Sequence, residues 1–153
     1  MNFEGQHRIS APIDKVWDAL NDPVILAECI PGCKSLQADD ANHFSAVIQL
    51  KIGPLNAKFD GTVRLEALDP PHRCTIIGEA KAGPAGFAKG HAVVMLAAEE
   101  SSITMLSYQI ESEIGGKIIR LGSHLVVATV KKLSNRFFTS LNAHFAGQAS
   151  TKA

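Results

Sequence analysis

The chain is poor in the residues that mark specialised protein classes. Its 153 residues include three cysteines, one tryptophan and one tyrosine, and the formal net charge is zero. A small, odd number of cysteines without a secretory signal indicates a reducing cytosol. Since the charges balance, the chain as a whole has no preference for nucleic acid, and we predict no nucleic-acid partner.

Segments for export or for membrane crossing are also missing. The N-terminus has no basic start followed by an apolar core, so we predict no signal peptide. The longest apolar runs are far shorter than the roughly 20 residues that span a bilayer. We therefore expect a cytoplasmic protein that is soluble, or peripheral at the inner face of the cell membrane.

No group of residues in the sequence points to catalysis or to a metal. The six histidines contain no pair at the spacing of a helical metal site. Cys29 and Cys33 are four residues apart, but Pro31 and Gly32 break any helix between them, and no second pair completes a zinc site. There is no useful Ser-His-Asp order, Gly-rich phosphate loop or nucleophile elbow. We predict a protein that is not an enzyme, with no catalytic residue, no metal and no cofactor.

The length and composition fit one globular domain. A chain of 153 residues can bury a core without disulfides or metals. Hydrophobic residues make up 46% and charged residues 20%, which is an ordinary globular balance. We predict a single domain over residues 1–146 and a frayed tail over residues 147–153.

Apolar periodicity predicts one strand and two short helices at the start of the chain. Alternating side chains predict a strand over residues 3–9. Ser10 can cap a helix that has Pro12 in its first turn and ends at Leu20. A second, shorter helix then runs to about Cys29.

A period of two replaces the helical spacing from Cys33 onward, and turn residues separate the alternating runs. The predicted strands cover residues 44–52, 55–67, 73–82, 88–98 and 102–114. Because short turns join these strands, we expect neighbours to pair antiparallel as a meander.

One long helix is predicted after Gly115 and Gly116, ending at about Phe145, with Gly122 as a weak point. Its apolar stripe consists of Ile119, Val126, Val130, Leu133, Phe137, Leu141 and Phe145. A sheet with one apolar face must cover that face, and this stripe is the one large partner available. The predicted fold class is α+β, with a curved antiparallel sheet wrapped around the C-terminal helix.

Two ordered groups of residues resemble a known superfamily and one of its families. Residues 9–12, 16–17, 20 and 22–23 resemble the opening of the helix-grip (START-like, SRPBCC) superfamily. A second group resembles the CoxG family of carbon monoxide dehydrogenase proteins, and its most specific part is Cys-Ile-Pro-Gly-Cys at residues 29–33. Its other parts are Gly61, residues 69–71, residues 86–90, Tyr108 and residues 115–122.

The resemblance implies a helix-grip fold with an apolar cavity. It also implies a non-catalytic accessory protein that binds a quinone or lipid-like molecule. Such a protein would serve a molybdenum hydroxylase of the carbon monoxide dehydrogenase type, in enzyme recruitment or electron delivery at the membrane. Family members often carry a longer C-terminal extension that contacts the membrane. This chain stops just past its long helix, so we do not expect anchoring through such an extension.

The candidate ligand site lies between the sheet and the long helix. Inward positions mix small residues such as Ala46 and Gly61 with large ones such as Phe59. That mixture suits either a tight core or a void, and the resemblance favours the void. The Tyr108 hydroxyl should point inward, where it needs a buried partner, a water or a ligand carbonyl. The predicted ligand-binding residues are Ile30, Pro31, Phe59, Phe87, Tyr108 and Val126, with the turn at Ile30 and the hairpin at Phe87 gating entry.

Charge is distributed unevenly along the chain. No Asp or Glu follows Glu113, whereas six Lys and Arg residues do, so the first 113 residues carry the opposite excess. The basic helix is therefore a solvated outer face, or a contact surface for an acidic partner or an anionic membrane. Two alternative functions stay open: a helix-grip enzyme acting on an apolar substrate, and a cavity-free protein-interaction module.

Overall fold

A computed structural model describes residues 1–151 of the chain. The elements follow the order β1 (Asn2–Ile9), α1 (Ile13–Leu20), α2 (Pro23–Cys29), β2 (Cys33–Asp40), β3 (His43–Ile52), β4 (Leu55–Asp69), β5 (Arg73–Lys81), the short 3-10 turn η1 (Gly83–Ala85), β6 (Phe87–Glu100), β7 (Ile103–Gly115), α3 (Lys117–Arg120) and α4 (Ser123–Thr151). The predicted α+β class is confirmed by this arrangement of strands and helices.

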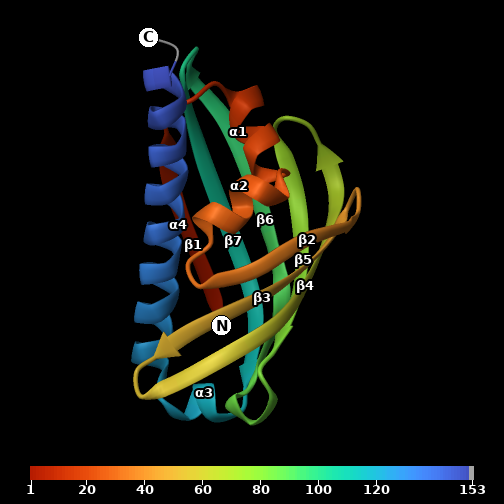
Figure 1. The fold of residues 1–153 in the computed structure, drawn as a ribbon, viewed down its shortest axis with the longest axis vertical. Coiled ribbons are helices and arrows are strands. Elements are labelled where there is room, and N and C mark those ends of the chain that lie inside the picture. Colours follow the sequence, from red (N-terminus) through yellow and green to blue (C-terminus); the bar gives the residue numbers. More distant parts are fainter. Residues whose placement is uncertain (152–153) are drawn as a thin grey trace.

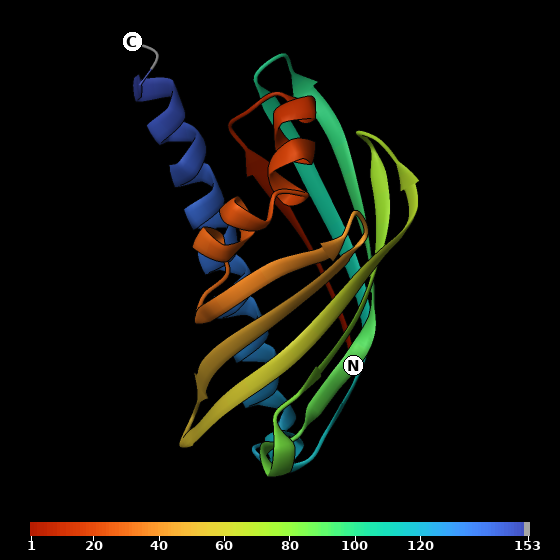
Figure 2. The same cartoon turned by 45° about the vertical axis from the view of Figure 1, so that its right-hand side comes forward.

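The seven strands form one antiparallel sheet in the order β1-β7-β6-β5-β4-β3-β2. From β2 to β7 each strand pairs with its neighbour in the chain, which confirms the predicted meander, and β1 pairs along the free edge of β7. Figures 1 and 2 show the sheet curling around one side of α4, while no element of residues 1–151 covers the other side of α4.

The two short helices begin differently from one another. The Asp22 side chain accepts a 2.9 Å hydrogen bond from the Val24 backbone N–H, and Pro23 occupies the first turn of α2. The residue before α1 is Pro12, which offers no side-chain cap. The prediction that Ser10 caps α1 is therefore wrong, because Ser10 lies two residues further from the helix. Its backbone N–H instead donates to Asn142 Oδ1 at 3.0 Å.

The C-terminal helix is interrupted, contrary to the single helix that the apolar stripe predicts. Helix α3 ends at Arg120 and α4 begins at Ser123. Between them Gly122 has φ of +96°, a left-handed conformation that ends a right-handed helix and suits glycine best. Helix α4 then continues to Thr151, into the segment expected to be frayed, and residues 152–153 lie outside the described part of the chain.

The buried apolar side chains form two separate cores. The first core joins α1 and α2 to the C-terminal half of α4 and to β1, β6 and β7, and contains Ile9, Ala11, Val16, Ala19, Cys29, Leu96, Leu106, Phe138, Leu141 and Phe145. The second core lies near α3 and the start of α4, and contains Ile52, Ala57, Phe59, Ile118 and Val126. The middle of the sheet lies between the two cores, and its inward residues are small.

Candidate functional site: apolar recesses between sheet and helix

The middle of the sheet carries an apolar recess of about 340 Å³ on its inner face. On β6, Leu96 belongs to the first core. Between Leu96 and η1, the inward positions include the small residues Ala92, Gly90 and Ala88. The recess is floored by the small residues Ala46, Gly61, Gly78, Ala80, Ala88, Gly90 and Ala92. Since protein interiors normally pack tightly, a row of small residues facing no large partner leaves this space open.

A second recess of about 240 Å³ reaches under α4. Helix α4 contributes Val126, Thr129, Val130 and Leu133, and the sheet side includes Phe59. The two recesses share Ile48, Ala80 and Ala88 in their walls. They therefore adjoin one another and form an elongated apolar space, which we call the joined recesses.

Three of the six predicted site residues line the joined recesses. Ile30, at the end of α2, lines the first recess, while Phe59 and Val126 line the second. The sequence missed most of the floor, because alanine and glycine at alternating positions signal a strand and not a site. Their small size was the one available signal.

Pro31 and Phe87, which we expected at the entrance, line neither recess. Pro31 is half-buried in the turn after α2. Phe87 pairs with Gly115 and its ring covers that glycine, whereas the next residue, Ala88, faces the joined recesses. Successive residues of a strand point to opposite faces, so Phe87 lies on the outer face of the sheet and the expectation that it gates the recesses is wrong.

Tyr108 points inward as predicted, but it also lies outside the linings of the joined recesses. Its hydroxyl forms a 2.9 Å hydrogen bond with Ser134 Oγ on α4. Ser134 Oγ also lies 3.5 Å from His7 Nε2. We call these three residues the hydroxyl cluster. It joins β1, β7 and α4, and Ser134 is a partner that the sequence did not reveal.

Aromatic stacking holds the hydroxyl cluster in place. The rings of His7 and Phe138 stack at 3.9 Å between centroids, with 18° between their planes. Burial lowers the pKa of His7, because a charged imidazole is costly away from water. The neutral ring is therefore favoured, with one nitrogen as donor and the other as acceptor.

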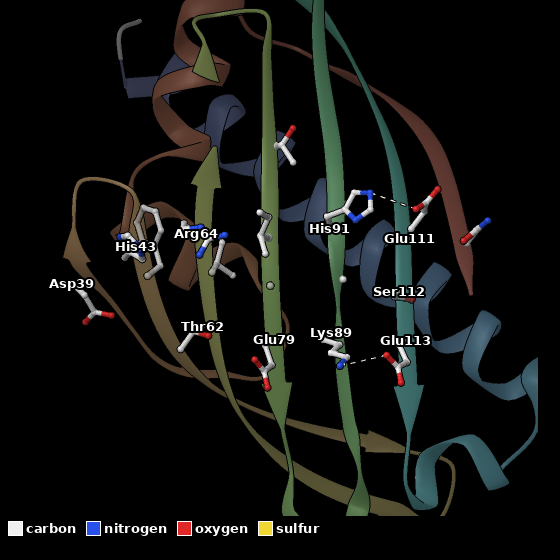
Figure 3. Close-up of a pocket in the computed structure, with 17 residues that line it drawn as sticks. Asp39, His43, Thr62, Arg64, Glu79, Lys89, His91, Glu111, Ser112 and Glu113 are labelled. Atoms are coloured by element: carbon white, nitrogen blue, oxygen red, sulfur yellow. Dashed lines mark ion pairs between the residues drawn. The ribbon is translucent and has the colours of Figure 1, made fainter. Parts of the chain in front are cut away.

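A larger recess, of about 800 Å³, lies on the outer face of the sheet (Figure 3). Many of its side chains are polar and come from the outward positions of several strands, and Phe44, Val63 and Ile77 also line it. Lys89 Nζ lies 3.5 Å from Glu113 Oε2, and His91 Nε2 lies 3.5 Å from Glu111 Oε2. These charges pair with each other across neighbouring strands, as on an ordinary exposed sheet face.

Neither the cysteines nor the acidic residues form a metal centre within residues 1–151, where no group of three His, Cys, Asp or Glu side chains could hold an ion. Cys29 and Cys74 are buried free thiols. Burial raises the pKa of both thiols, which keeps them protonated and unreactive.

The outer side of α4 is basic. Lys131, Lys132 and Arg136 are exposed there, and the described part of the chain has no acidic residue after Glu113. None of the helices between residues 1 and 151 has the length and apolar character needed to cross a bilayer.

Comparison with known proteins places this geometry in a family. The model of the carbon monoxide dehydrogenase CoxG family matches residues 5–146. A conserved protein from Geobacillus kaustophilus is 28% identical, with 96% of each chain covered and a TM-score of 0.90. No curated protein sequence matches the chain.

More distant structures share the fold alone. A START superfamily protein from Mycobacterium smegmatis is 10% identical, covering 94% of this chain and 95% of that chain, with a TM-score of 0.68. The Zhui aromatase/cyclase from a Streptomyces species is 14% identical, covering 94% of this chain and 92% of that chain, with a TM-score of 0.65. The predicted helix-grip fold is thereby confirmed.

Proposed function

Because the chain belongs to the carbon monoxide dehydrogenase CoxG family, we propose that it is a non-catalytic accessory protein that holds an apolar molecule in the joined recesses. The ligand is a quinone or a lipid-like molecule. The protein then serves a molybdenum hydroxylase of the carbon monoxide dehydrogenase type.

The observation that carries this proposal is the apolar space that runs from the middle of the sheet to the second core under α4. The N-terminal half of α4 supplies Val126, Val130 and Leu133 to that space, and the sheet supplies seven alanines and glycines among larger apolar residues. Pockets that bind small molecules are concave and mostly apolar, with few polar groups. A cavity-free interaction module, the alternative left open by the sequence, would have a filled middle instead.

We also propose that the protein contacts the membrane, and the basic character of α4 supports this. Lys131, Lys132 and Arg136 are exposed on α4, and no acidic residue follows Glu113 in residues 114–151. Basic residues are attracted to the anionic lipids of the cytoplasmic leaflet. The protein would thus bring its ligand, and the enzyme that it serves, to the inner face of the membrane.

The direct test is mass spectrometry of an organic extract from protein purified from its native host. We expect a stoichiometric quinone or other isoprenoid. An empty extract, together with no binding after incubation with quinones, would contradict the proposal. Protein denatured before purification and extracted in parallel controls for lipid that adheres nonspecifically.

A helix-grip enzyme is the second candidate, and one observation favours it. His7 and Tyr108 come from different strands yet converge on the Ser134 hydroxyl, which gives a hydroxyl beside a neutral imidazole. General-base catalysis needs such a pair, although it also needs substrate within reach. Incubation with fatty-acyl esters tests this candidate: hydrolysis that Ser134→Ala abolishes would support an enzyme and contradict a purely carrier role.

A further inference from the structure

The hydroxyl cluster of His7, Tyr108 and Ser134 lies outside the linings of the joined recesses, but residues near it on β7 and α4 belong to those linings. On β7, Tyr108 precedes by two residues Ile110, which lines the first recess. Two residues of strand span about 7 Å. On α4, Ser134 directly follows Leu133, which lines the second recess. The 2.9 Å bond between Tyr108 and Ser134 therefore links sheet and helix just beyond the recesses, on the side of the first core.

Two hydroxyl groups that line the joined recesses, on Ser112 and Thr129, already donate hydrogen bonds to backbone carbonyls. Ser112, in the first recess, donates from Oγ to the Met1 carbonyl at 3.0 Å. Thr129, in the second recess, donates from Oγ1 to the Leu125 carbonyl at 2.8 Å. Since a hydroxyl carries one proton, neither residue has a donor left for a ligand.

The hydroxyl cluster differs because it has a donor to spare. Tyr108, Ser134 and neutral His7 together carry three donors, while two contacts join them. When His7 Nε2–H donates to Ser134 Oγ and Ser134 donates to the Tyr108 oxygen, the Tyr108 O–H is free. It can then donate to an acceptor that arrives from the recesses, without breaking the cluster.

We propose that the hydroxyl cluster binds one acceptor oxygen of the ligand, with Tyr108 as the donor and with Ser134 and His7 as positioning residues. This inference rests on the proposed function and narrows its ligand class. The ligand is an extended apolar molecule with a carbonyl oxygen near one end, and not a plain hydrocarbon. The apolar body lies in the joined recesses and the oxygen lies at Tyr108.

A matched pair of probes tests the inference. 2-Undecanone and undecane have the same length and differ by one carbonyl oxygen, and both can be measured by displacement of a fluorescent apolar probe from the intact protein. We expect Tyr108→Phe to weaken 2-undecanone binding by about five-fold, the worth of one ordinary hydrogen bond, and to leave undecane binding unchanged. Ser134→Ala should act in the same direction, and thermal melting of each variant verifies its fold.

Ser112→Ala is the matched control, because it removes a hydroxyl from the recess wall without touching the cluster. Any effect of Ser112→Ala should fall equally on the two probes, because the hydroxyl that it removes already donates to the Met1 carbonyl. Equal loss of both probes in Tyr108→Phe, or selective loss of the ketone in Ser112→Ala, would overturn the inference and leave the carrier function standing. Failure of the wild-type protein to bind either probe would overturn the carrier function as well.

Discussion

At the scale of single residues, Gly5 is fixed by the residue opposite it. Gly5 pairs with Tyr108, and a Cβ added at Gly5 would lie 2.6 Å from the Tyr108 hydroxyl and 2.8 Å from the ring. The absent side chain therefore makes the space that lets Tyr108 reach Ser134. A glycine in the middle of a strand is otherwise a disadvantage, so its role is steric.

We predict that Gly5→Ala lowers the free energy of unfolding by about 1–3 kcal/mol, the usual cost of overpacking. In a Tyr108→Leu background the same change should cost much less, because the ring that it meets is gone. Urea denaturation of the four proteins of this cycle measures the coupling. Equal costs in both backgrounds would show that Tyr108 is not the obstacle.

His7 makes stability depend on pH, and the direction follows from its burial. The pKa of His7 is lowered below its usual 6.5 in the folded protein, so the unfolded chain binds more protons as the pH falls past 6.5. Stability from this residue is complete above pH 6.5 and is lost as the pH falls through the lowered folded-state pKa. We expect wild type to lose more stability between pH 7.5 and 5.5 than His7→Gln does. The other five histidines are common to both proteins and cancel.

At the scale of elements, the floor of the recess contains glycines of two kinds. A Cβ at Gly61 would meet Glu79 O at 3.7 Å and Ala80 Cβ at 3.8 Å, which are ordinary contacts. A Cβ at Gly90 would overlap the backbone oxygen of Glu111. Both glycines line the first recess, yet only Gly61 has room for a side chain.

Gly61→Val should therefore fill the recess at no cost to the fold. We expect unchanged or higher stability, by about 0.5–1 kcal/mol, since glycine is unfavourable inside a strand. Uptake of an apolar fluorescent probe should fall at the same time. Gly90→Val is the paired variant and should unfold readily. A Gly61→Val protein that keeps full probe uptake would place the ligand somewhere other than this recess.

The elements themselves were largely predictable from the sequence, for a local reason. Alternation placed the strands from β3 to β7, and short turns implied their pairing order. Two details failed, one in a local backbone conformation and one in a contact across the fold. Gly122 adopts φ of +96° and splits the helix, and Ser10 bonds to Asn142 in place of capping α1. No period of apolar residues encodes either one.

At the scale of the whole molecule, the resemblance to the CoxG family implied a void between sheet and helix, but only some of the residues assigned to it line the joined recesses. Three predicted residues line it, while Phe87 faces the other side of the sheet and Tyr108 bonds to Ser134. The position of the void depends on where the buried side chains of the two cores end. That boundary is set by the packing of α1 and α2 against the C-terminal half of α4.

The uneven charge of the molecule provides the last prediction, which concerns the membrane. Lys131, Lys132 and Arg136 are exposed on α4, a helix that the sheet covers on one side only (Figure 1). Each basic residue near an anionic surface contributes about 1 kcal/mol. Replacing all three with Gln should weaken binding to phosphatidylserine-containing vesicles by about 100-fold, as measured by vesicle sedimentation in roughly 0.1 M salt.

A second triple variant with the same change in net charge distinguishes the effect of the α4 surface from the effect of net charge. Lys51, Lys58 and Lys81 are exposed on the sheet, so changing these three to Gln alters the net charge by the same amount on a different face. We expect that variant to bind the vesicles nearly as well as wild type, and wild-type binding to weaken in roughly 0.5 M salt because ions screen exposed charges. Equal losses in the two triple variants would mean that attraction to the membrane comes from overall charge, and that α4 presents no dedicated surface.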